Sequence, residues 1–390
     1  MPGLVVKPRS RIFHGHDWVY ASEVQKAFGN PVAGDVISLK DFKDRPLGTA
    51  IYNPESQIVA RRFSRRKQQL DAEFFVRRLE RAQKLRESLG FTEPLYRLVW
   101  SEADGLPGVV IDRYGSHFVL QTLTLAMDRR KAIIVEAMQT CFGEDIVVVE
   151  RNDSAIRKAE GLEPSTGVMA GQWNGPFEID VNGLKQEIDL IEGQKTGIYL
   201  DQLDNYASVA ALAKGKRVLD CFCNQGGFAL HAAKAGAASV LAVDISATAV
   251  ASTLENAARN ELTVEAEEAN VFDFLKEAET AGREFDLIVL DPPSFTKSRK
   301  SVSGAMRGYK EIHLRALKLL TREGILSTYS CSHHINEKEF FGMVCDASVD
   351  AKRTLRLIDR HSQRRDHPII ATIPETHYLK GFTFQNVGGF

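Results

Sequence analysis

Four short apolar runs in the C-terminal half of the chain constrain its fold most strongly. They cover residues 217–221, 240–243, 285–290 and 325–329, and stretches with helical periodicity separate them. This alternation predicts a doubly wound α/β domain with a mostly parallel sheet. Ligands of such sheets bind beyond the carboxyl ends of the strands, so the residues that follow each run are the first candidates for a functional site.

The N-terminal half has a different organisation. The 390 residues exceed the length of one ordinary core, so two or three domains are expected. Residues 1–70 show short strands between turn signals such as Gly34-Asp35 and predict a small β-barrel. Residues 71–190 begin with a helical stretch up to Leu89 and predict a middle α+β domain. Residues 191–390 hold the α/β domain.

The composition is that of a soluble globular protein, with 44% hydrophobic and 26% charged residues. No stretch reaches the roughly 20 apolar residues of a membrane helix, and the N-terminus lacks a signal-peptide pattern. The odd number of cysteines, five, favours a reducing compartment. We therefore expect a cytoplasmic protein that does not contact a membrane.

Two basic clusters stand out although the net charge is −1. The first contains Arg61, Arg62, Arg65, Arg66 and Lys67, and the second contains Lys297, Arg299, Lys300, Arg307 and Lys310. Each cluster could be an ordinary solvated face or could hold the phosphates of a nucleic acid.

The first two apolar runs end in acids that suit a nucleoside ligand. Asp220 ends the first run, and Phe222 and the pair Gly226-Gly227 follow it, where glycines would let the backbone approach a ligand. The pattern is not G-x-G-x-x-G, which disfavours a nicotinamide cofactor. Asp244 ends the second run and is placed to bind ribose hydroxyls, although it could instead share the cap of the next helix with Ser246. Further on, Asn270 could contact an adenine edge.

The third and fourth runs end in residues that suit chemistry on a base. In Asp291-Pro292-Pro293 the prolines hold an extended turn, and the carboxylate could bind an exocyclic amine or share a proton with a ring nitrogen. The alternative for Asp291 is a cap of the following loop. Cys331 follows the fourth run, and a thiolate that adds to carbon 6 of cytosine makes carbon 5 nucleophilic. The alternative for Cys331 is a small buried apolar residue.

Together these features resemble a class I S-adenosylmethionine-dependent methyltransferase of the Rossmann-like type, with a seven-stranded sheet. The upstream segment 193–202, GQKTGIYLDQ, resembles a segment of the 23S ribosomal RNA cytosine-C5 methyltransferases that carry an N-terminal PUA domain. Residues 15–20, 101–108, 366–368 and 378–382 also match motifs of that family, so the resemblance covers nearly the whole chain.

The resemblance implies a specific reaction and a set of site residues. A methyl group would pass from S-adenosylmethionine to carbon 5 of a cytidine in large-subunit ribosomal RNA, with Cys331 as nucleophile and Asp291 beside it. The family also implies a homodimer. The expected cofactor residues are Lys195, Thr196, Gly197, Leu200, Asp201, Gln202, Asp220, Phe222, Gly226, Asp244, Ile245, Ser246, Asn270, Val271 and Asp291. The expected RNA contacts are Arg61, Arg62, Arg65, Arg66, Pro292, Pro293, Phe295, Lys297, Arg307 and Lys380.

The chain departs from the family pattern at three positions. Leu203 stands where the family often has arginine, Asn224 where it has glycine, and Asn270 where it has aspartate. The adenine contact is the one these departures affect most, although the side-chain carbonyl of Asn270 could still accept from the adenine amino group.

Two rival functions remain open from the sequence. Methylation of an exocyclic amine would use the acid-Pro-Pro motif without a cysteine, but Ser294 separates that motif from the aromatic Phe295. A non-catalytic RNA-binding assembly factor would not need the intact cofactor loop. The base that removes the carbon-5 proton is also open, between His367, Glu375, His377 and a bound water.

Overall fold

The computed structural model describes residues 1–193, 197–296 and 298–388, which form two compact units. Unit 1 consists of Met1–Phe177, Ile188–Leu200 and Arg365–His377, and unit 2 of Glu178–Glu187, Asp201–Arg364 and Tyr378–Phe390. The three-domain division at residues 70 and 190 remains a prediction. Within the described part of the chain, no helix has the length and apolarity to span a membrane.

Unit 2 contains the predicted seven-stranded, mostly parallel sheet. Only β20 runs antiparallel to both of its neighbours, β18 and β19. The strands, in spatial order, are β16 (Glu265–Glu268), β15 (Ser239–Asp244), β14 (Arg217–Cys221), β17 (Phe285–Leu290), β18 (Leu320–Ser330), β20 (Lys380–Asn386) and β19 (Leu355–Ser362). The strand order reverses between β14 and β17, so the carboxyl ends of these two strands form the switch point at which such folds bind ligands.

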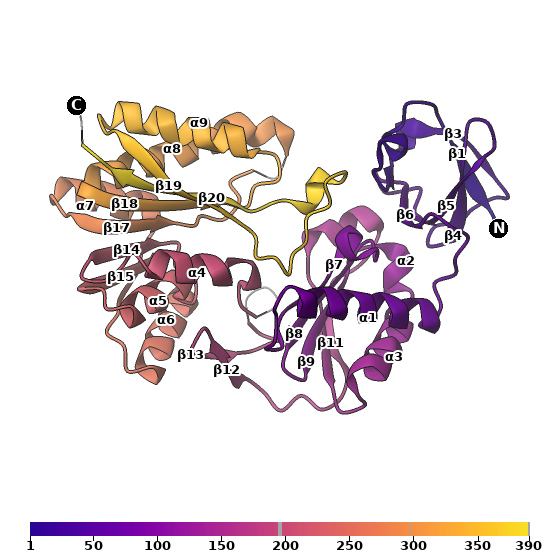
Figure 1. Ribbon diagram of the computed structural model, residues 1–390, viewed down its shortest axis with the longest axis horizontal. Helices are drawn as coiled ribbons and strands as arrows, with labels where there is room; N and C mark the ends of the chain where they lie inside the picture. Colours follow the sequence, from indigo (N-terminus) through magenta and orange to yellow (C-terminus); the bar gives the residue numbers. More distant parts are fainter. Residues whose placement is uncertain (194–196, 297, 389–390) are drawn as a thin grey trace. The chain divides into compact units, whose positions relative to one another are not determined.

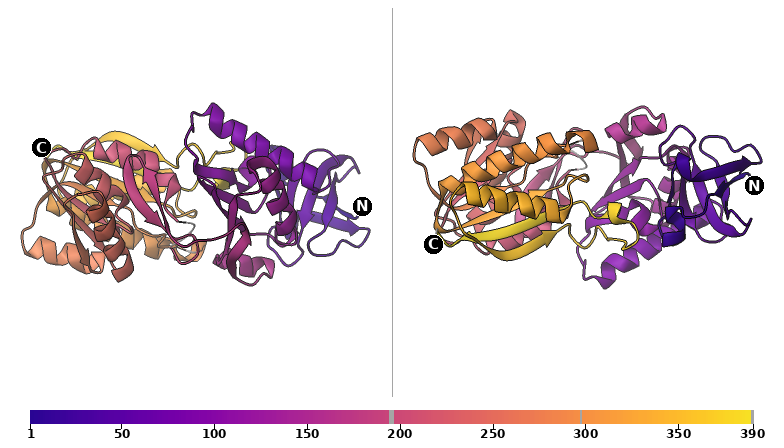
Figure 2. Two further views of the ribbon diagram at one scale, coloured as in Figure 1. Left: turned by 90° about the horizontal axis from the view of Figure 1, so that it is seen from below. Right: turned by 90° about the horizontal axis from the view of Figure 1, so that it is seen from above.

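Helices cover both faces of this sheet (Figure 1). One group comprises α4 (Leu203–Ala210), α5 (Gly227–Lys234) and α6 (Ala247–Arg259), and the other comprises α7 (Val271–Thr280), α8 (Val302–Leu319) and α9 (Glu337–Asp350). Side chains of α7, α8 and α9 form one buried cluster with the sheet, which includes Phe274, Tyr309 and Phe340. Figure 2 shows the same layered arrangement from two further directions.

Unit 1 begins with a six-stranded sheet. Its strands, in spatial order, are β2 (Trp18–Val19), β6 (Ala60–Ser64), β5 (Pro46–Tyr52), β4 (Val36–Asp41), β1 (Gly3–Val6) and β3 (Val24–Phe28). The strand pairs are antiparallel except for β1 with β4. Alternate residues such as Ile37 and Leu39 point inward and form a small core with Leu4 and Val6.

The rest of unit 1 is built on a five-stranded sheet. Its strands, in spatial order, are β11 (Ser165–Ala170), β10 (Val147–Asn152), β9 (His117–Thr122), β8 (Val109–Tyr114) and β7 (Leu95–Trp100). Helices α1 (Ala72–Ser88) and α3 (Lys131–Phe142) pack against it, and α2 (Leu125–Asp128) is a single turn. Asp71 caps α1 by accepting from the Phe74 amide, as the sequence indicates. The hairpin that follows along the chain, β12 (Phe177–Val181) and β13 (Leu184–Ile188), belongs to unit 2 over residues 178–187.

Two buried histidines in unit 2 are neutral, and their burial favours the neutral form. Nδ1 of His231 donates to the Gly227 carbonyl at 2.7 Å, and Nδ1 of His313 donates to the Tyr309 carbonyl at 2.6 Å. Nε2 of His313 therefore accepts from the Thr328 hydroxyl at 2.7 Å, and this bond would be lost on protonation. Burial lowers the pKa of each of the two histidines to about 4.

We expect unit 2 to lose stability as the pH falls from about 6.5 to about 4. In this pH window the histidines of the unfolded chain bind protons, whereas those of the folded chain stay neutral. The free energy of unfolding therefore decreases as the pH decreases, by roughly 2–3 kcal/mol for each histidine. Urea unfolding at several pH values measures the loss. The double variant H231Q/H313Q should show a shallower dependence, and an equal slope in the variant and the parent would contradict this explanation.

Candidate functional site

Asp220, at the end of β14, anchors the loop that leads into α5. Its side chain is fully buried, and Oδ2 accepts from the Ala229 amide at 2.9 Å. Oδ1 has no hydrogen-bond partner among the described residues. Burial raises the pKa of this carboxyl well above its usual range, and the charges of Asp291 and Asp244 raise it further. The edge of the sheet thus gathers three carboxyl groups.

The loop after β14 takes a sharp path through left-handed backbone conformations. Phe222, Asn224 and Gly226 have φ angles of 62°, 49° and 80°. Gly226 and Gly227 have a packing role: a Cβ on Gly227 would lie 2.3 Å from Cζ of Tyr206, and one on Gly226 would lie 2.7 Å from Cγ2 of Thr253. Steric exclusion inside unit 2 therefore explains the glycine pair without the ligand approach that the sequence suggested.

Asp244 ends β15 and holds two backbone amides. Oδ2 accepts from Asn224 N and Oδ1 from Ser246 N, each at 3.0 Å. Ser246 caps α6 through its own hydroxyl, so Asp244 is not that helix's cap. Each carboxylate oxygen keeps a second lone pair, so Asp244 retains the capacity to accept from ribose hydroxyls. Ile245 beside it is exposed, with 67% of its surface accessible.

Asn270 lies exposed at the start of α7. Its Oδ1 accepts from the Phe272 amide at 2.9 Å and caps the helix, so one lone pair of the carbonyl proposed for adenine is already used. Val271 packs its side chain into the core, which leaves only its backbone for a ligand.

The segment expected to line the cofactor pocket is divided between the two units. Gly197 and Leu200 belong to unit 1 and are buried, whereas Asp201 and Gln202 belong to unit 2. Lys195 and Thr196 lie outside the described residues. Gln202 Nε2 donates to Asp291 Oδ2 at 2.9 Å and so orients this carboxylate.

Two further contacts fix this part of unit 2. The Gln202 side-chain carbonyl accepts from Asn205 at 2.6 Å, and Asp201 Oδ2 accepts from the Tyr378 hydroxyl at 2.6 Å. Leu203, which stands at a position where the family often has arginine, is buried in the first turn of α4.

Asp291 and Cys331 follow adjacent parallel strands, β17 and β18, at one edge of the sheet. Both side chains are half-buried. The loops that carry them are joined by a 2.9 Å hydrogen bond between the hydroxyls of Ser294 and Ser332, and Ser332 also contacts the Tyr309 hydroxyl at 3.0 Å. No sequence pattern indicated this hydroxyl network.

The residues around the Pro-Pro turn differ in exposure. Pro292 is buried and Pro293 is exposed. Phe295 is half-buried, with its ring centroid 4.6 Å from that of Tyr309 and 5.8 Å from that of Phe272. It therefore belongs to the aromatic packing on α8 and α7.

Lys380, at the start of β20, is buried and serves the loop that carries Cys331. Its ammonium donates to the carbonyls of Ser332 and Ile335 at 2.6 and 2.7 Å. Burial lowers its pKa to about 8, while the nearby Cys331 and Glu339 act in the opposite direction. This placement does not suit the RNA contact predicted from the sequence, because the amine is directed into the protein.

The first basic cluster divides into paired and unpaired arginines. Arg61 forms a 2.8 Å ion pair with Glu102, and Arg62 is buried in a 2.7 Å ion pair with Asp17. Arg65 and Arg66 are exposed. Arg61 and Arg62 thus have structural partners, which weakens their assignment as RNA contacts. In the second cluster Arg307 is exposed on α8, and Lys297 lies outside the described residues.

The candidates for the base that removes a proton belong to unit 1. His16 Nε2 contacts Glu375 Oε2 at 2.9 Å, and this bond lowers the pKa of Glu375. His367 is buried, with Nδ1 2.8 Å from Asp366 Oδ1. His377 is half-buried.

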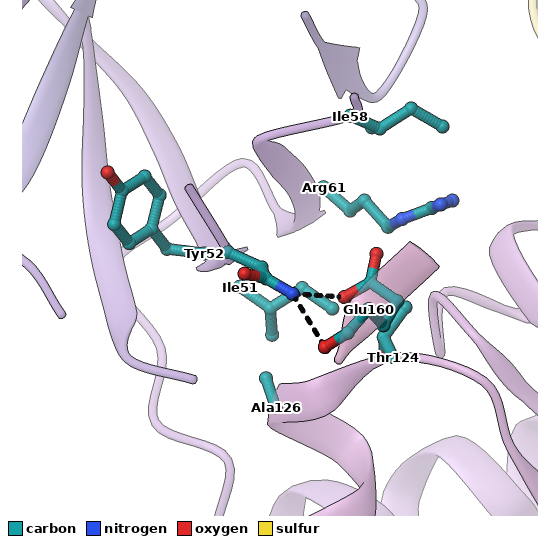
Figure 3. A pocket seen from close by; sticks show the side chains of 8 residues that line it. Ile51, Tyr52, Ile58, Arg61, Thr124, Ala126 and Glu160 are labelled. Atoms are coloured by element: carbon teal, nitrogen blue, oxygen red, sulfur yellow. Dashed lines mark hydrogen bonds between the residues drawn. The ribbon is translucent and has the colours of Figure 1, made fainter. Parts of the chain in front are cut away.

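A cavity between β5 and α2 in unit 1 carries no candidate site. Its volume is about 10 Å³, enough for one water molecule. Asn53, which follows β5, donates across it to the backbone and side-chain oxygens of Glu160 at 3.1 and 2.8 Å (Figure 3).

The edge of the sheet in unit 2 fits S-adenosylmethionine. The charges of Asp244 and Asp291 raise the electrostatic cost of ionising Asp220, and one buried oxygen of Asp220 has no partner among the described residues. A ligand with a sulfonium, an ammonium and ribose hydroxyls would offset that repulsion and supply donors. Asp244 and Asp291 are the residues that would hold these groups.

Comparison with known proteins shows the relationships of both halves. A family model described as a PUA-like domain matches residues 7–65, and one described as a methyltransferase domain matches residues 212–372. The chain is 42% identical over 375 residues to "Ribosomal RNA large subunit methyltransferase I" of Photobacterium profundum, and the match covers 94% of each protein. The proteins of that name from Shewanella denitrificans and Vibrio parahaemolyticus are 43% and 40% identical, covering 94% and 97% of each chain.

Two solved structures share the fold. A methyltransferase complexed with SAH has a TM-score of 0.86 at 23% identity, and a SAM-dependent methyltransferase from Streptococcus mutans has a TM-score of 0.85 at 23% identity. Each comparison covers 99% of this chain and 100% of the other.

We expect Asp244→Ala to weaken S-adenosylmethionine binding by about 10- to 150-fold, because a hydrogen bond to a charged group contributes roughly 1.5–3 kcal/mol. Calorimetric titration measures the affinity. Asp244→Asn keeps one acceptor and should lose less, and Asp273→Ala, at an exposed acid on α7, is the matched control. Unchanged affinity in folded Asp244→Ala would remove this residue from the site.

Proposed function

The chain belongs to the ribosomal RNA large subunit methyltransferase I family, and from this premise we propose that it methylates carbon 5 of a cytidine through a bond to Cys331. It is an S-adenosylmethionine-dependent methyltransferase of ribosomal RNA. The observation that supports the cytosine-C5 reaction is the placement of a half-buried cysteine and a carboxylate after adjacent parallel strands, beside the candidate cofactor edge.

The proposed reaction uses Cys331 as a nucleophile. Its thiolate adds to carbon 6 of the cytosine, and the displaced electron pair makes carbon 5 nucleophilic. Carbon 5 would then form its new bond to the methyl group of S-adenosylmethionine as the methyl–sulfur bond breaks, and the electron pair of that bond stays on sulfur to leave the neutral thioether S-adenosylhomocysteine. A base then removes the proton from carbon 5, and the electron pair of that C–H bond restores the ring double bond and expels the thiolate.

Asp291 would orient the base during addition. Its carboxylate can accept from the exocyclic amine or share a proton with the ring nitrogen, which stabilises the ring as the thiolate adds. The bond from Gln202 holds one carboxylate oxygen in place. The target base must leave its stack to reach these groups, so we expect naked or partly assembled large-subunit ribosomal RNA as the substrate.

Lys380 would act as a positioning residue. Its ammonium fixes two carbonyls of the loop after Cys331, and its charge favours the thiolate over the thiol. An exocyclic-amine methyltransferase would have no use for a charge at this place. The packing of Phe295 against Tyr309 also leaves that ring less available to stack on a base.

We expect Cys331→Ala to abolish methylation while S-adenosylmethionine affinity stays nearly unchanged, because the cofactor residues follow other strands. RNA with 5-fluorocytidine at the target should trap the parent enzyme covalently, because fluorine cannot leave as a cation and the final elimination fails. Denaturing gels and mass spectrometry detect the adduct. Near-normal turnover of folded Cys331→Ala, with no adduct in the parent, would exclude the carbon-5 mechanism and favour amine methylation.

We expect Lys380→Met to make the Cys331 thiolate less favourable relative to the thiol, because a nearby cation is removed. The rate of iodoacetamide alkylation of Cys331, followed by peptide mass spectrometry against pH, should move to higher pH. Lys338→Met, at an exposed lysine on α9, is the matched control. An unmoved alkylation profile in folded Lys380→Met would limit Lys380 to a structural role.

A further inference from the structure

A groove in unit 1 gathers four arginines that have no acidic partner among the residues that the structure describes. The groove has a volume of about 610 Å³ and lies between the end of β6 and helix α1. No ion pair in the described part of the chain involves Arg65, Arg66, Arg78 or Arg81, all of which line it. Many of the other arginines in the described residues are paired with a carboxylate, so this group is a local excess of positive charge.

The two acids that line the groove do not neutralise this excess. Asp17 is paired with Arg62 at 2.7 Å, and Asp104 is paired with the buried Arg86 at 2.6 Å. Burial and the positive charges of Arg81 and Arg77 lower the pKa of Arg78, and the charges of Asp104 and Asp17 offset this only in part. The arginines therefore repel one another, and a polyanion in the groove would relieve that repulsion.

The side chain of Arg78 is held in place by contacts within the protein, before any ligand binds. Its Nη2 donates to the Phe63 carbonyl at 2.9 Å, and its guanidinium lies 5.1 Å from the centroid of the Phe74 ring. A guanidinium held in this way loses little conformational freedom when it binds a phosphate. Arg65, Arg66 and Arg81 are exposed around it.

The groove also offers apolar surface between the charges. Leu85, Pro368 and Ile370 line it and are each half-buried. Duplex RNA presents mainly phosphates and ribose hydroxyls to a protein, whereas a single strand also presents the flat faces of its bases. Guanidinium groups interspersed with apolar side chains fit the single strand better. The volume is in the range of sites that enclose a ligand of nucleotide size.

We propose that this groove binds a single-stranded segment of the RNA substrate, with helix α1 supplying half of the phosphate contacts. The inference rests on the proposed RNA substrate but not on the reaction at Cys331, which belongs to unit 2. It adds Arg78 and Arg81 to the RNA-binding residues and places them with Arg65 and Arg66 in one site.

Helix α1 provides a matched pair of arginines for the test. Arg81 lines the groove, whereas Arg77, one turn earlier on the helix, does not line it and is ion-paired with Glu73. Fluorescence anisotropy of the full-length protein with a short labelled single-stranded RNA, at several KCl concentrations, gives the affinity and its salt dependence. The variants are R77Q, R81Q and R65Q/R66Q/R81Q, with circular dichroism as the folding check.

R81Q should make the slope of log affinity against log salt concentration shallower by about 0.7, and the triple variant by about 2. Each phosphate contact that is lost means that RNA binding releases fewer counterions. R77Q should behave as the parent does. Equal slopes for R81Q and R77Q would overturn the proposal. Equally tight binding of duplex RNA by the parent would overturn the single-strand assignment, and stronger competition by polyglutamate than by unlabelled RNA would indicate an acidic protein partner instead.

The outcome does not depend on the proposed chemistry. RNA binding is measured without S-adenosylmethionine and without turnover, so an active Cys331→Ala enzyme would leave these slopes unaffected. Conversely, unchanged slopes in folded groove variants would exclude the groove while leaving the carbon-5 mechanism intact.

Discussion

The hydrogen bond from the Ala229 amide to the buried carboxyl of Asp220 links the central strand β14 to the start of α5. The loop after β14 and its contact with the neighbouring strand depend on this hydrogen bond. It sets the path of the intervening loop, whose Asn224 amide then reaches Asp244 on the neighbouring strand. The charges of Asp244 and Asp291 raise the pKa of Asp220, so the same link holds this carboxyl beside the two acids that would bind the cofactor.

The sequence predicted the parallel sheet well because its central strands are buried on both faces and therefore form continuous apolar runs. The expected run at 285–290 is β17 to the residue. Strand β19, Leu355–Ser362, gave no signal, since it lies at the edge of the sheet with alternating polar residues. The helical stretch expected from residue 71 to Leu89 is α1, Ala72–Ser88.

The candidate site was predictable only in part. Residues at strand ends, such as Asp291 and Cys331, can be located from the pattern, because a strand end fixes where a side chain lies. The ion-pair and hydrogen-bond partners of a charged side chain cannot be located from the pattern, because they come from distant segments of the chain. The sequence places Arg62 in a basic cluster, whereas in the structure it forms an ion pair with Asp17. Lys380 was expected to contact RNA, whereas its ammonium donates to two backbone carbonyls.

The discontinuous composition of unit 1 has a consequence for the way the chain is synthesised. Arg86 on α1 is fully buried, and its guanidinium donates to the Asp366 carbonyl at 2.6 Å. The Asp366 carboxylate in turn accepts from the Arg97 amide at 2.8 Å. Residue 366 leaves the ribosome after nearly the whole chain, whereas domains generally fold from the N-terminus during translation. Arg86 keeps its ion pair with Asp104 meanwhile, but unit 1 lacks these two hydrogen bonds until residue 366 has emerged, so the interior of the nascent unit stays incompletely bonded.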